Sequence, residues 1–233
     1  HKRTDGFWFM CRTMLTLLPI VGLVGSNNLS TAIIILGIGV ILIFAASPRY
    51  IQFAALGGAG IGFIAIFLAA ESYRLERLAI WREPEKYEKG FQTIQGLYAI
   101  GSGGLFGRGI GNSIQKLGFV PEAQNDMIFS IICEEMGLTG AIILILIFAL
   151  LLWRLCVISM NCQELSGAMI AAGIMGHLAI QVILNIAVVT NTIPNTGISL
   201  PFISYGGTSV LFLMIEMGLA LNVSRQKNNP PTR

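Results

Sequence analysis

Residues Leu138–Cys156 read LTGAIILILIFALLLWRLC, an apolar run whose single charged residue, Arg154, stands near its end. A helix needs about 20 apolar residues to cross the hydrocarbon core of a bilayer, and this run is long enough. Of the 233 residues in the chain, 54% are hydrophobic and only 12% are charged, about half the charged share of a soluble domain. The composition therefore predicts an integral membrane protein and excludes a cytosolic enzyme of ordinary composition.

Six stretches of the chain meet the same length requirement. They are Phe7–Ser26, Leu29–Ala46, Ile51–Ala70, Leu138–Cys156, Leu165–Val189 and Thr208–Val223. We therefore expect an all-α integral membrane protein with six transmembrane helices and a long extracytoplasmic loop between the third and the fourth. The expected parts are three helices in 1–70, the loop in 71–137, and three helices in 138–233. Residues 190–207 would form a second extracytoplasmic connection.

The basic residues predict the orientation of these helices. Those near one set of helix ends are Lys2, Arg3, Arg12, Arg49, Arg154, Arg225, Lys227 and Arg233. The short connections at the opposite ends, Asn27–Asn28 and Thr190–Gly207, contain no Lys or Arg. The positive-inside rule then predicts cytoplasmic termini and a cytoplasmic tail. Because the chain starts at His1 without a signal-peptide pattern, we expect an internal fragment or a processed chain.

The long loop holds most of the charge, including nine of the twelve acids. Its first part, Tyr73–Trp81, alternates charged and apolar residues at helical spacing. Further on, Glu122 and Asp126 stand four residues apart, so they would share a face if helical. Asp126 precedes an apolar run, where partial desolvation should raise its pKa; the alternative is a helix-capping acid. Of the adjacent acids Glu134 and Glu135, we expect at least one to pair with a loop arginine.

Two further groups of residues leave alternatives open. The glycine-rich run Gly101–Gly111 is either a tight turn packed on protein or an anion site beside Arg108 and Lys116. In the fifth predicted helix, His177, Gln181 and Asn185 recur every four residues, which indicates either hydrogen bonding between helices or a hydrophilic path. Glu216 in the sixth is a functional candidate, because an acid inside a membrane is costly unless paired.

Two long motifs carry a resemblance to a known family. Gly109–Gly137 reads GIGNSIQKLGFVPEAQNDMIFSIICEEMG, and Pro194–Ser209 reads PNTGISLPFISYGGTS. Both closely resemble the SEDS family (shape, elongation, division and sporulation), whose members include FtsW, RodA and SpoVE, with FtsW and SpoVE the nearer. The likeness covers essentially the whole chain. Family members have ten spans, and this chain would correspond to the fifth through tenth.

The resemblance implies a peptidoglycan glycosyltransferase that polymerises lipid II at the outer face of the bacterial plasma membrane, for cell division or sporulation. It implies that Asp126 is the essential acid, that a divalent cation (Mg²⁺ or Mn²⁺) supports the reaction, and that a class B penicillin-binding protein is the partner. No nucleic acid partner is expected. The chain departs from the family at Asn28 and Thr196, where relatives commonly carry Asp and Lys.

These observations combine in one hypothesis about mechanism. A sugar hydroxyl that attacks an anomeric carbon must lose its proton, so a carboxylate is needed as general base, and we assign Asp126 to that role. The departing lipid pyrophosphate needs positive charge. The expected substrate-binding residues are Arg77, Arg108, Lys116, Glu122, Ser204 and Tyr205.

Two rival interpretations of function remain at this point. The first is a lipid II flippase or transporter that uses His177, Gln181, Asn185 and Glu216 as a hydrophilic path. The second is an inactive scaffold fragment that binds a penicillin-binding protein.

Overall fold

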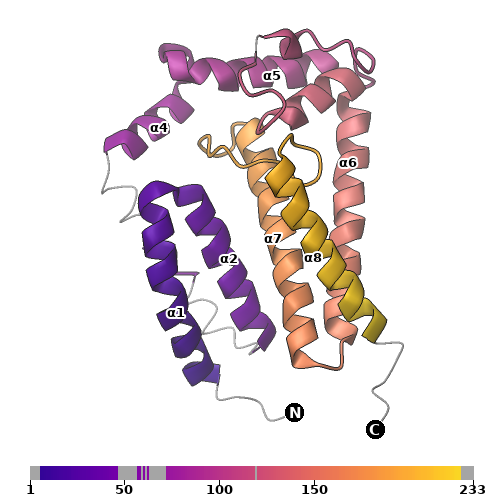
Figure 1. The fold of residues 1–233 in the computed structure, drawn as a ribbon. Helices are drawn as coiled ribbons and strands as arrows, with labels where there is room; N and C mark the ends of the chain where they lie inside the picture. The colour runs from indigo at the N-terminus through magenta and orange to yellow at the C-terminus, as the bar shows by residue number, and fades with distance from the viewer. Residues whose placement is uncertain are drawn as a thin grey trace. The chain divides into compact units, whose positions relative to one another are not determined.

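The computed structural model describes residues 6–46, 57, 58, 60, 62, 72–118 and 120–226. Within these residues every regular element is a helix (Figure 1). The chain divides into two compact units, each assembled from segments that are distant in sequence. The first comprises His1–Glu71, Leu152–Ile180 and Met214–Arg233, and the second comprises Ser72–Leu151 and Gln181–Leu213. The candidate site lies wholly in the second unit.

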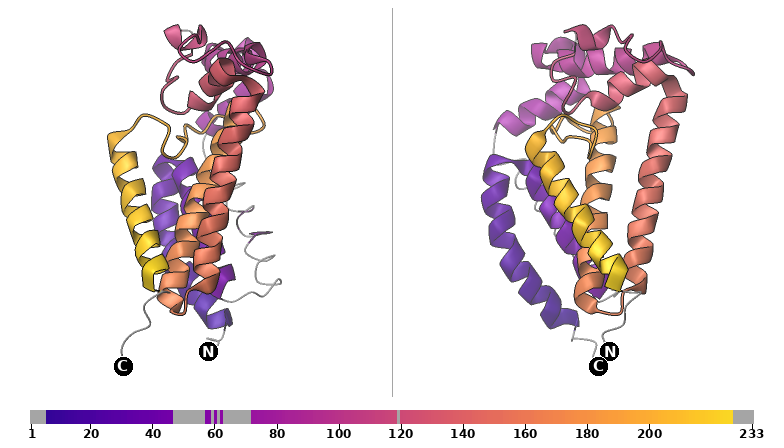
Figure 2. Two further views of the ribbon diagram at one scale, coloured as in Figure 1. Left: turned by 90° about the vertical axis from the view of Figure 1, so that its right-hand side faces the viewer. Right: turned by 45° about the vertical axis from the view of Figure 1, so that its right-hand side comes forward.

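The first unit contains a helical hairpin of α1 (Gly6–Asn27) and α2 (Leu29–Ala46), which lie side by side in Figures 1 and 2. Asn28 forms the corner between them. Its side-chain Oδ1 accepts a hydrogen bond from the Thr31 N–H at 3.2 Å, which caps the start of α2. The residue that departs from the family at this position is therefore a competent helix cap.

Four of the described helices are long and apolar enough to cross a membrane. They are α2, α6 (Ile128–Asn161), α7 (Leu165–Val189) and α8 (Gly207–Gln226). The bounds of α2 and α7 agree with those predicted. The expectation of six spans is thus only partly confirmed. The first predicted span is covered by the helix α1, which is not among the four, and Ile51–Ala70 lies outside the described residues.

Helix α6 begins ten residues before the predicted start at Leu138. It consists of two helical sections joined at Gly137, whose φ of 67° and ψ of −166° interrupt the helix. A side chain at Gly137 would collide with the backbone of Leu105 and Gly107, so only glycine permits this close approach. The charged residues before the glycine made this first section resemble a loop in the sequence.

The segment 71–137, expected as a loop, is largely folded. It contains α4 (Ser72–Arg82), α5 (Phe91–Gly103) and three short 3₁₀ helices, η1 (Pro84–Lys86), η2 (Glu88–Gly90) and η3 (Gln115–Leu117). α4 confirms the helix predicted for Tyr73–Trp81. α5 lies crosswise over the beginning of α6 (Figures 1 and 2). Of these elements, α4, η2 and α5 contribute to the walls of the candidate site.

One apolar core holds the second unit together. Its buried members come from the segment before α6, from α6 and α7, and from the loop before α8. They are Val120, Ala123, Met127, Phe129, Ile131, Cys133, Ala141, Phe148, Val182, Val189 and Leu200. Because both sequence motifs contribute to this core, burial of their apolar side chains brings the two motifs together.

Candidate functional site

The segment Pro121–Asp126 consists of turns rather than a helix. Glu122 and Asp126 would share a face only if this segment were helical, and that condition is not met, because α6 starts only at Ile128. Glu122 itself has a left-handed backbone with φ 53°, and its exposed carboxylate accepts a hydrogen bond from the Asn125 side chain. Turns in place of a helix give the two acids different surroundings.

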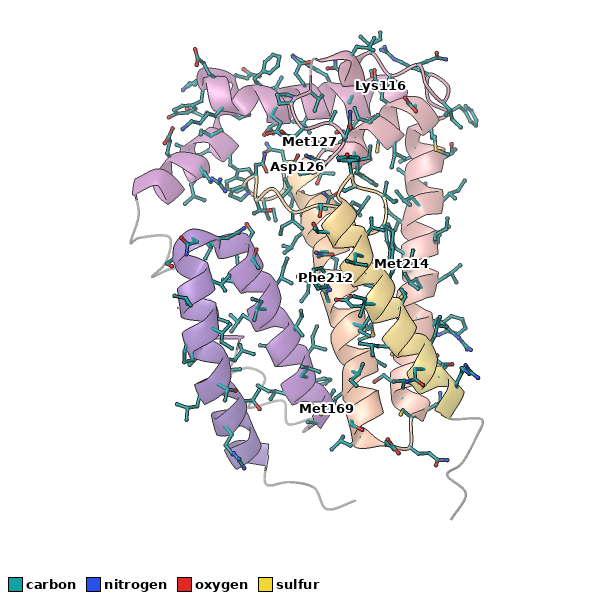
Figure 3. All side chains as sticks on the ribbon, viewed as in Figure 1. Lys116, Asp126, Met127, Met169, Phe212 and Met214 are labelled. Atoms are coloured by element: carbon teal, nitrogen blue, oxygen red, sulfur yellow. The ribbon has the colours of Figure 1, made fainter. Side chains whose placement is uncertain are left out.

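Asp126 is a buried acid with 9% of its surface exposed, at the amino end of α6 (Figure 3). The Nδ2 atom of Asn185, a fully buried side chain on α7, donates to the Asp126 carbonyl at 2.8 Å and to the Ile198 carbonyl at 2.7 Å. One amide thus joins the two motif segments. For Asn185 this favours the hydrogen-bonding interpretation of the polar stripe.

The Asp126 carboxylate is held by a glutamine on α5. Gln92 donates through Nε2 to Asp126 Oδ1 and to the Pro121 carbonyl, both at 3.2 Å. The Gln92 Oε1 atom accepts in turn from Asn195 Nδ2 at 3.2 Å. Sequence analysis missed Gln92, because nothing in a lone glutamine 34 residues before an aspartate signals their contact.

Burial raises the pKa of Asp126 above that of an ordinary aspartate. Hydrogen bonds from the backbone and from Gln92 oppose this effect, and the nearby negative charge of Glu122 adds to it. The direction confirms the prediction from the apolar run that follows Asp126. A carboxylate with a raised pKa binds a proton more readily, which is the property that a general base requires.

Asp126 lines a cavity of about 310 Å³ in the second unit. The other lining residues come from α4, η2, α5 and the loop before α8. They are Glu76, Arg77, Ile80, Trp81, Lys89, Gln92, Thr93, Asn191, Asn195, Thr196 and Gly197. The cavity therefore combines one buried acid with two cationic side chains and several amides.

The two cations of this cavity are held by different partners. Arg77, which sequence analysis proposed, donates to the Asn195 carbonyl at 3.3 Å. Lys89 forms an ion pair with Glu76 at 3.0 Å. Sequence analysis missed Lys89 and Glu76, since in a segment of alternating charges both resemble ordinary solvated residues.

Arg108 and Lys116, the other predicted cations, lie elsewhere. Neither residue is among the described residues that line the cavity, and Lys116 is labelled well apart from Asp126 in Figure 3. Arg108 Nη1 lies 3.5 Å from Glu134 Oε1, and Lys116 Nζ lies 2.6 Å from Glu135 Oε1. The expected pairing of one of these acids with a loop arginine is confirmed by Glu134 and Arg108.

The glycine-rich turn is bound to protein. The Arg108 N–H donates to the Glu134 carbonyl and the Gly109 N–H to the Glu135 carbonyl, both at 2.9 Å. The Gly107 N–H donates to the Gly103 carbonyl at 2.8 Å. N–H groups engaged in this way are not available to a phosphate. The structure favours the tight turn over the anion site.

Ser204 and Tyr205 form hydrogen bonds with the backbone just before Asp126 and do not line the cavity. Ser204 Oγ donates to the Asn125 carbonyl at 2.6 Å and accepts from the Leu200 N–H at 2.7 Å. The Tyr205 N–H donates to the Gln124 carbonyl at 2.8 Å, while its side chain is exposed. Within the described part of the chain, neither residue lines the cavity.

His177 and Glu216 form a pair in the first unit. His177 Nδ1 lies 2.9 Å from Glu216 Oε1. Pairing provides the partner that an acid inside a membrane helix needs, so Glu216 has a structural explanation. The pair favours hydrogen bonding between α7 and α8 over a path for solutes.

Oxygen ligands for a cation are few in the cavity. In the part of the chain that the structure describes, no group of three or more His, Cys, Asp and Glu side chains could hold a metal ion. The cavity carboxylates are Glu76 and Asp126. Mg²⁺ commonly uses one or two carboxylates together with waters and substrate phosphates, so the number of carboxylates in the cavity is compatible with such a cation.

Comparison with known proteins decides the family. The model of the FtsW/RodA/SpoVE family, described as "Cell cycle protein", matches residues 2–229. The chain belongs to this family. The resemblance seen in the two motifs is thereby confirmed.

Individual relatives agree with this assignment. The chain is 44% identical over 201 residues to stage V sporulation protein E of Bacillus subtilis (strain 168), covering 85% of this chain and 55% of that protein. It is 37% identical over 214 residues to the probable peptidoglycan glycosyltransferase FtsW of Trichlorobacter lovleyi, covering 91% of this chain and 56% of that protein. The chain thus spans about half the length of the curated relatives it matches.

Solved structures of the family share the fold. A chain from work described as "Structural coordination of polymerization and crosslinking by a peptidoglycan synthase complex" superposes with a TM-score of 0.77, at 27% identity, over 95% of this chain and 63% of that one. The rod shape determining protein RodA of Thermus thermophilus gives a TM-score of 0.63 at 27% identity, over 94% of this chain and 57% of RodA.

Proposed function

We propose that the protein is a peptidoglycan glycosyltransferase that polymerises lipid II at the outer face of a bacterial plasma membrane, in cell division or sporulation. One observation carries the proposal: a buried aspartate with a raised pKa lines the same cavity as two cations. Relatives named peptidoglycan glycosyltransferase FtsW and stage V sporulation protein E support it. In this arrangement residues 71–137 and 190–207 face outward and both termini are cytoplasmic.

Asp126 is the general base of the proposed reaction. The oxygen of a sugar hydroxyl attacks the anomeric carbon of a second, lipid-linked sugar. The bond from that carbon to the pyrophosphate oxygen breaks, and its electron pair leaves with the lipid pyrophosphate. The hydroxyl proton passes to the Asp126 carboxylate and from there to water, which balances the step.

Arg77 and Lys89 are the proposed cations for the pyrophosphate. Both line the cavity with Asp126, whereas Arg108 and Lys116 are not among the described residues that line it. Preorganised positive charge stabilises the negative charge that develops on a leaving group. We therefore assign to Arg77 and Lys89 the role that sequence analysis divided among Arg77, Arg108 and Lys116.

A divalent cation, Mg²⁺ or Mn²⁺, would be held by Glu76 together with pyrophosphate oxygens and water. When bound, it would neutralise charge on the departing pyrophosphate. Glu122, which sequence analysis placed among the substrate-binding residues, accepts a hydrogen bond from Asn125 and is not among the described residues that line the cavity. The proposed partner is a class B penicillin-binding protein, in keeping with a similar chain that comes from a peptidoglycan synthase complex.

The test is polymerisation of lipid II by the purified protein in liposomes, with the partner and Mg²⁺ or Mn²⁺. Asp126→Asn keeps the size of the side chain and removes the base. Glu85→Gln is the matched control, because Glu85 is an exposed acid on η1 and is not among the described residues that line the cavity.

We expect glycan chains from the parent and from Glu85→Gln, and none from folded Asp126→Asn. Polymerisation by Asp126→Asn at the parent rate would contradict the assignment of the base. Lipid II that crosses the bilayer without forming chains would support the flippase instead.

A further inference from the structure

The three groups Asn195, Gln92 and Asp126 form a hydrogen-bonded series whose direction is set by the backbone. At one end, the Gly197 N–H donates to Asn195 Oδ1 at 3.0 Å. A backbone N–H can only donate, so Oδ1 must be the atom that faces it. The other side-chain atom of Asn195, Nδ2, is therefore the donor that reaches Gln92 Oε1.

The same reasoning orients Gln92. Its Oε1 accepts from Asn195, so its Nε2 must supply both remaining bonds. One goes to the Pro121 carbonyl, which can only accept, and the other to Asp126 Oδ1. The orientation of a side-chain amide is normally inferred from its surroundings. Here the Gly197 N–H at one end and the Pro121 carbonyl at the other require the same orientation of the two amides.

We propose that Gln92 and Asn195 are positioning residues for Asp126, forming an amide relay of fixed direction that holds its carboxylate in the cavity and always presents it with an N–H. The proposal rests on the proposed function, since it refines the role of Asp126 in that reaction. A fixed N–H favours the ionised carboxylate, which is the form able to accept the hydroxyl proton. The bond also limits rotation of the side chain, which keeps the base in one orientation.

Asn195 also links the base to the cation of the same cavity. Its side chain donates to Gln92, while its backbone carbonyl accepts from the Arg77 guanidinium at 3.3 Å. Asn195→Ala removes the side-chain contact and leaves the carbonyl. The variant therefore separates the relay from the positioning of Arg77.

Several charges act on Asp126 besides the relay. Glu122 is close enough for its negative charge to raise the Asp126 pKa, and Glu76, Arg77 and Lys89 line the same cavity. The Gln92 hydrogen bond lowers the pKa against the larger effect of burial. Loss of that bond, with the other charges unchanged, should raise the Asp126 pKa further.

The relay is tested with Gln92→Leu, which removes the amide, and with Gln92→Glu, which is nearly isosteric and replaces the donor by a carboxyl group. Gln95→Leu is the matched control, because Gln95 lies on the same helix, half-buried, and is not among the described residues that line the cavity. Two readouts are needed. One is infrared titration of the Asp126 carboxyl, assigned by subtraction of Asp126→Asn, and the other is the pH dependence of lipid II polymerisation.

For Gln92→Leu we expect the titration midpoint and the acid limb of the rate to move up by about one pH unit. On the plateau above that limb kcat should fall about tenfold with little change in KM, because the base is no longer held in one orientation. Gln92→Glu should move both in the same direction, because two carboxyl groups then compete for one proton. Gln95→Leu should match the parent.

Asn195→Ala should shift the titration midpoint of Asp126 in the same direction as Gln92→Leu, but by less. The double variant with Gln92→Leu should be no worse than Gln92→Leu alone, because residues of one hydrogen-bond series are not additive. An unchanged midpoint in both Gln92 variants would overturn the relay. Since the infrared midpoint does not depend on turnover, a parent that titrates as expected but makes no glycan would refute the proposed function and leave the relay standing.

Discussion

Glu134 is expected to hold the loop that leads to the segment Pro121–Asp126, and its removal should release that loop. Its side chain is fully buried on the first section of α6. It accepts hydrogen bonds from the Ser113 hydroxyl, from the Ile114 N–H at 3.2 Å and from the Gln115 N–H at 3.3 Å. Glu134→Ala would leave these donors without an acceptor.

The magnitude follows from the number and burial of these bonds. Each buried donor that loses its acceptor costs about 1–3 kcal/mol, and Glu134→Ala removes the acceptor of three donors. Arg108, whose side chain is 38% exposed, can turn to water, so its pairing adds little. Because two of the three donors are only partly buried, we expect Glu134→Ala to destabilise the loop by about 3–5 kcal/mol, in the lower part of the range for three such losses. Glu135→Ala is the neighbouring control. The Glu135 side chain is less deeply buried than that of Glu134, and its loss breaks the pair with Lys116 and a long hydrogen bond from the Ser113 N–H at 3.4 Å, which should together cost about 1 kcal/mol.

Hydrogen–deuterium exchange measures this loop directly. In Glu134→Ala, exchange of the amides of Ile114 and Gln115 should accelerate by about 10²–10³-fold, since each 1.4 kcal/mol is a factor of ten. In Glu135→Ala the acceleration should stay within about tenfold. Equal exchange in the two variants, or parent-like exchange in Glu134→Ala, would refute the account of this loop.

Three further predictions concern the cavity. Arg77→Ala and Lys89→Ala should each raise the KM for lipid II or lower kcat about tenfold or more, whereas Lys116→Ala should stay near the parent rate in the same liposome assay. Chelation of divalent cations should stop polymerisation, and Glu76→Gln should increase the Mg²⁺ concentration needed for half the maximal rate; a parent-like requirement would remove Glu76 from the cation site. Because burial raises the pKa of Asp126, activity should be lost as pH falls through that raised value. The stabilising effect of proton binding on the folded state has the opposite sign: it should be present at low pH and lost as pH rises through the same value. A pH titration of the polymerisation rate and of thermal stability tests both signs.

The elements that sequence analysis predicted well are those determined locally. Long apolar runs bounded by polar or helix-breaking residues give α2 and α7 with the bounds expected, since burial in lipid depends on composition alone. The raised pKa of Asp126 was predicted for a similar reason. An acid placed directly before an apolar run must lie close to low-dielectric surroundings.

The features that sequence analysis missed depend on contacts between distant residues. Gln92 meets Asp126 only because α5 lies crosswise over the beginning of α6 (Figure 1). Arg108 and Lys116 looked like substrate ligands because the two acids that bind them follow about 20 residues later. No periodic pattern in the sequence reports such pairings.

The early start of α6 was missed for a related reason. The first section of the helix carries Glu134, whose charge is satisfied by loop groups that the sequence does not place beside it. The kink at Gly137 also requires backbone of the glycine-rich turn as a neighbour. A buried charge therefore resembles a loop residue until its partners are known.

The rate of glycan formation from lipid II by Asp126→Asn, measured beside the parent protein in liposomes with the partner and Mg²⁺, tests the central claim most directly. The account predicts glycan chains from the parent and a loss of at least about 10²-fold in the variant, the usual contribution of a general base. Parent-like chain formation by a folded Asp126→Asn protein would contradict it.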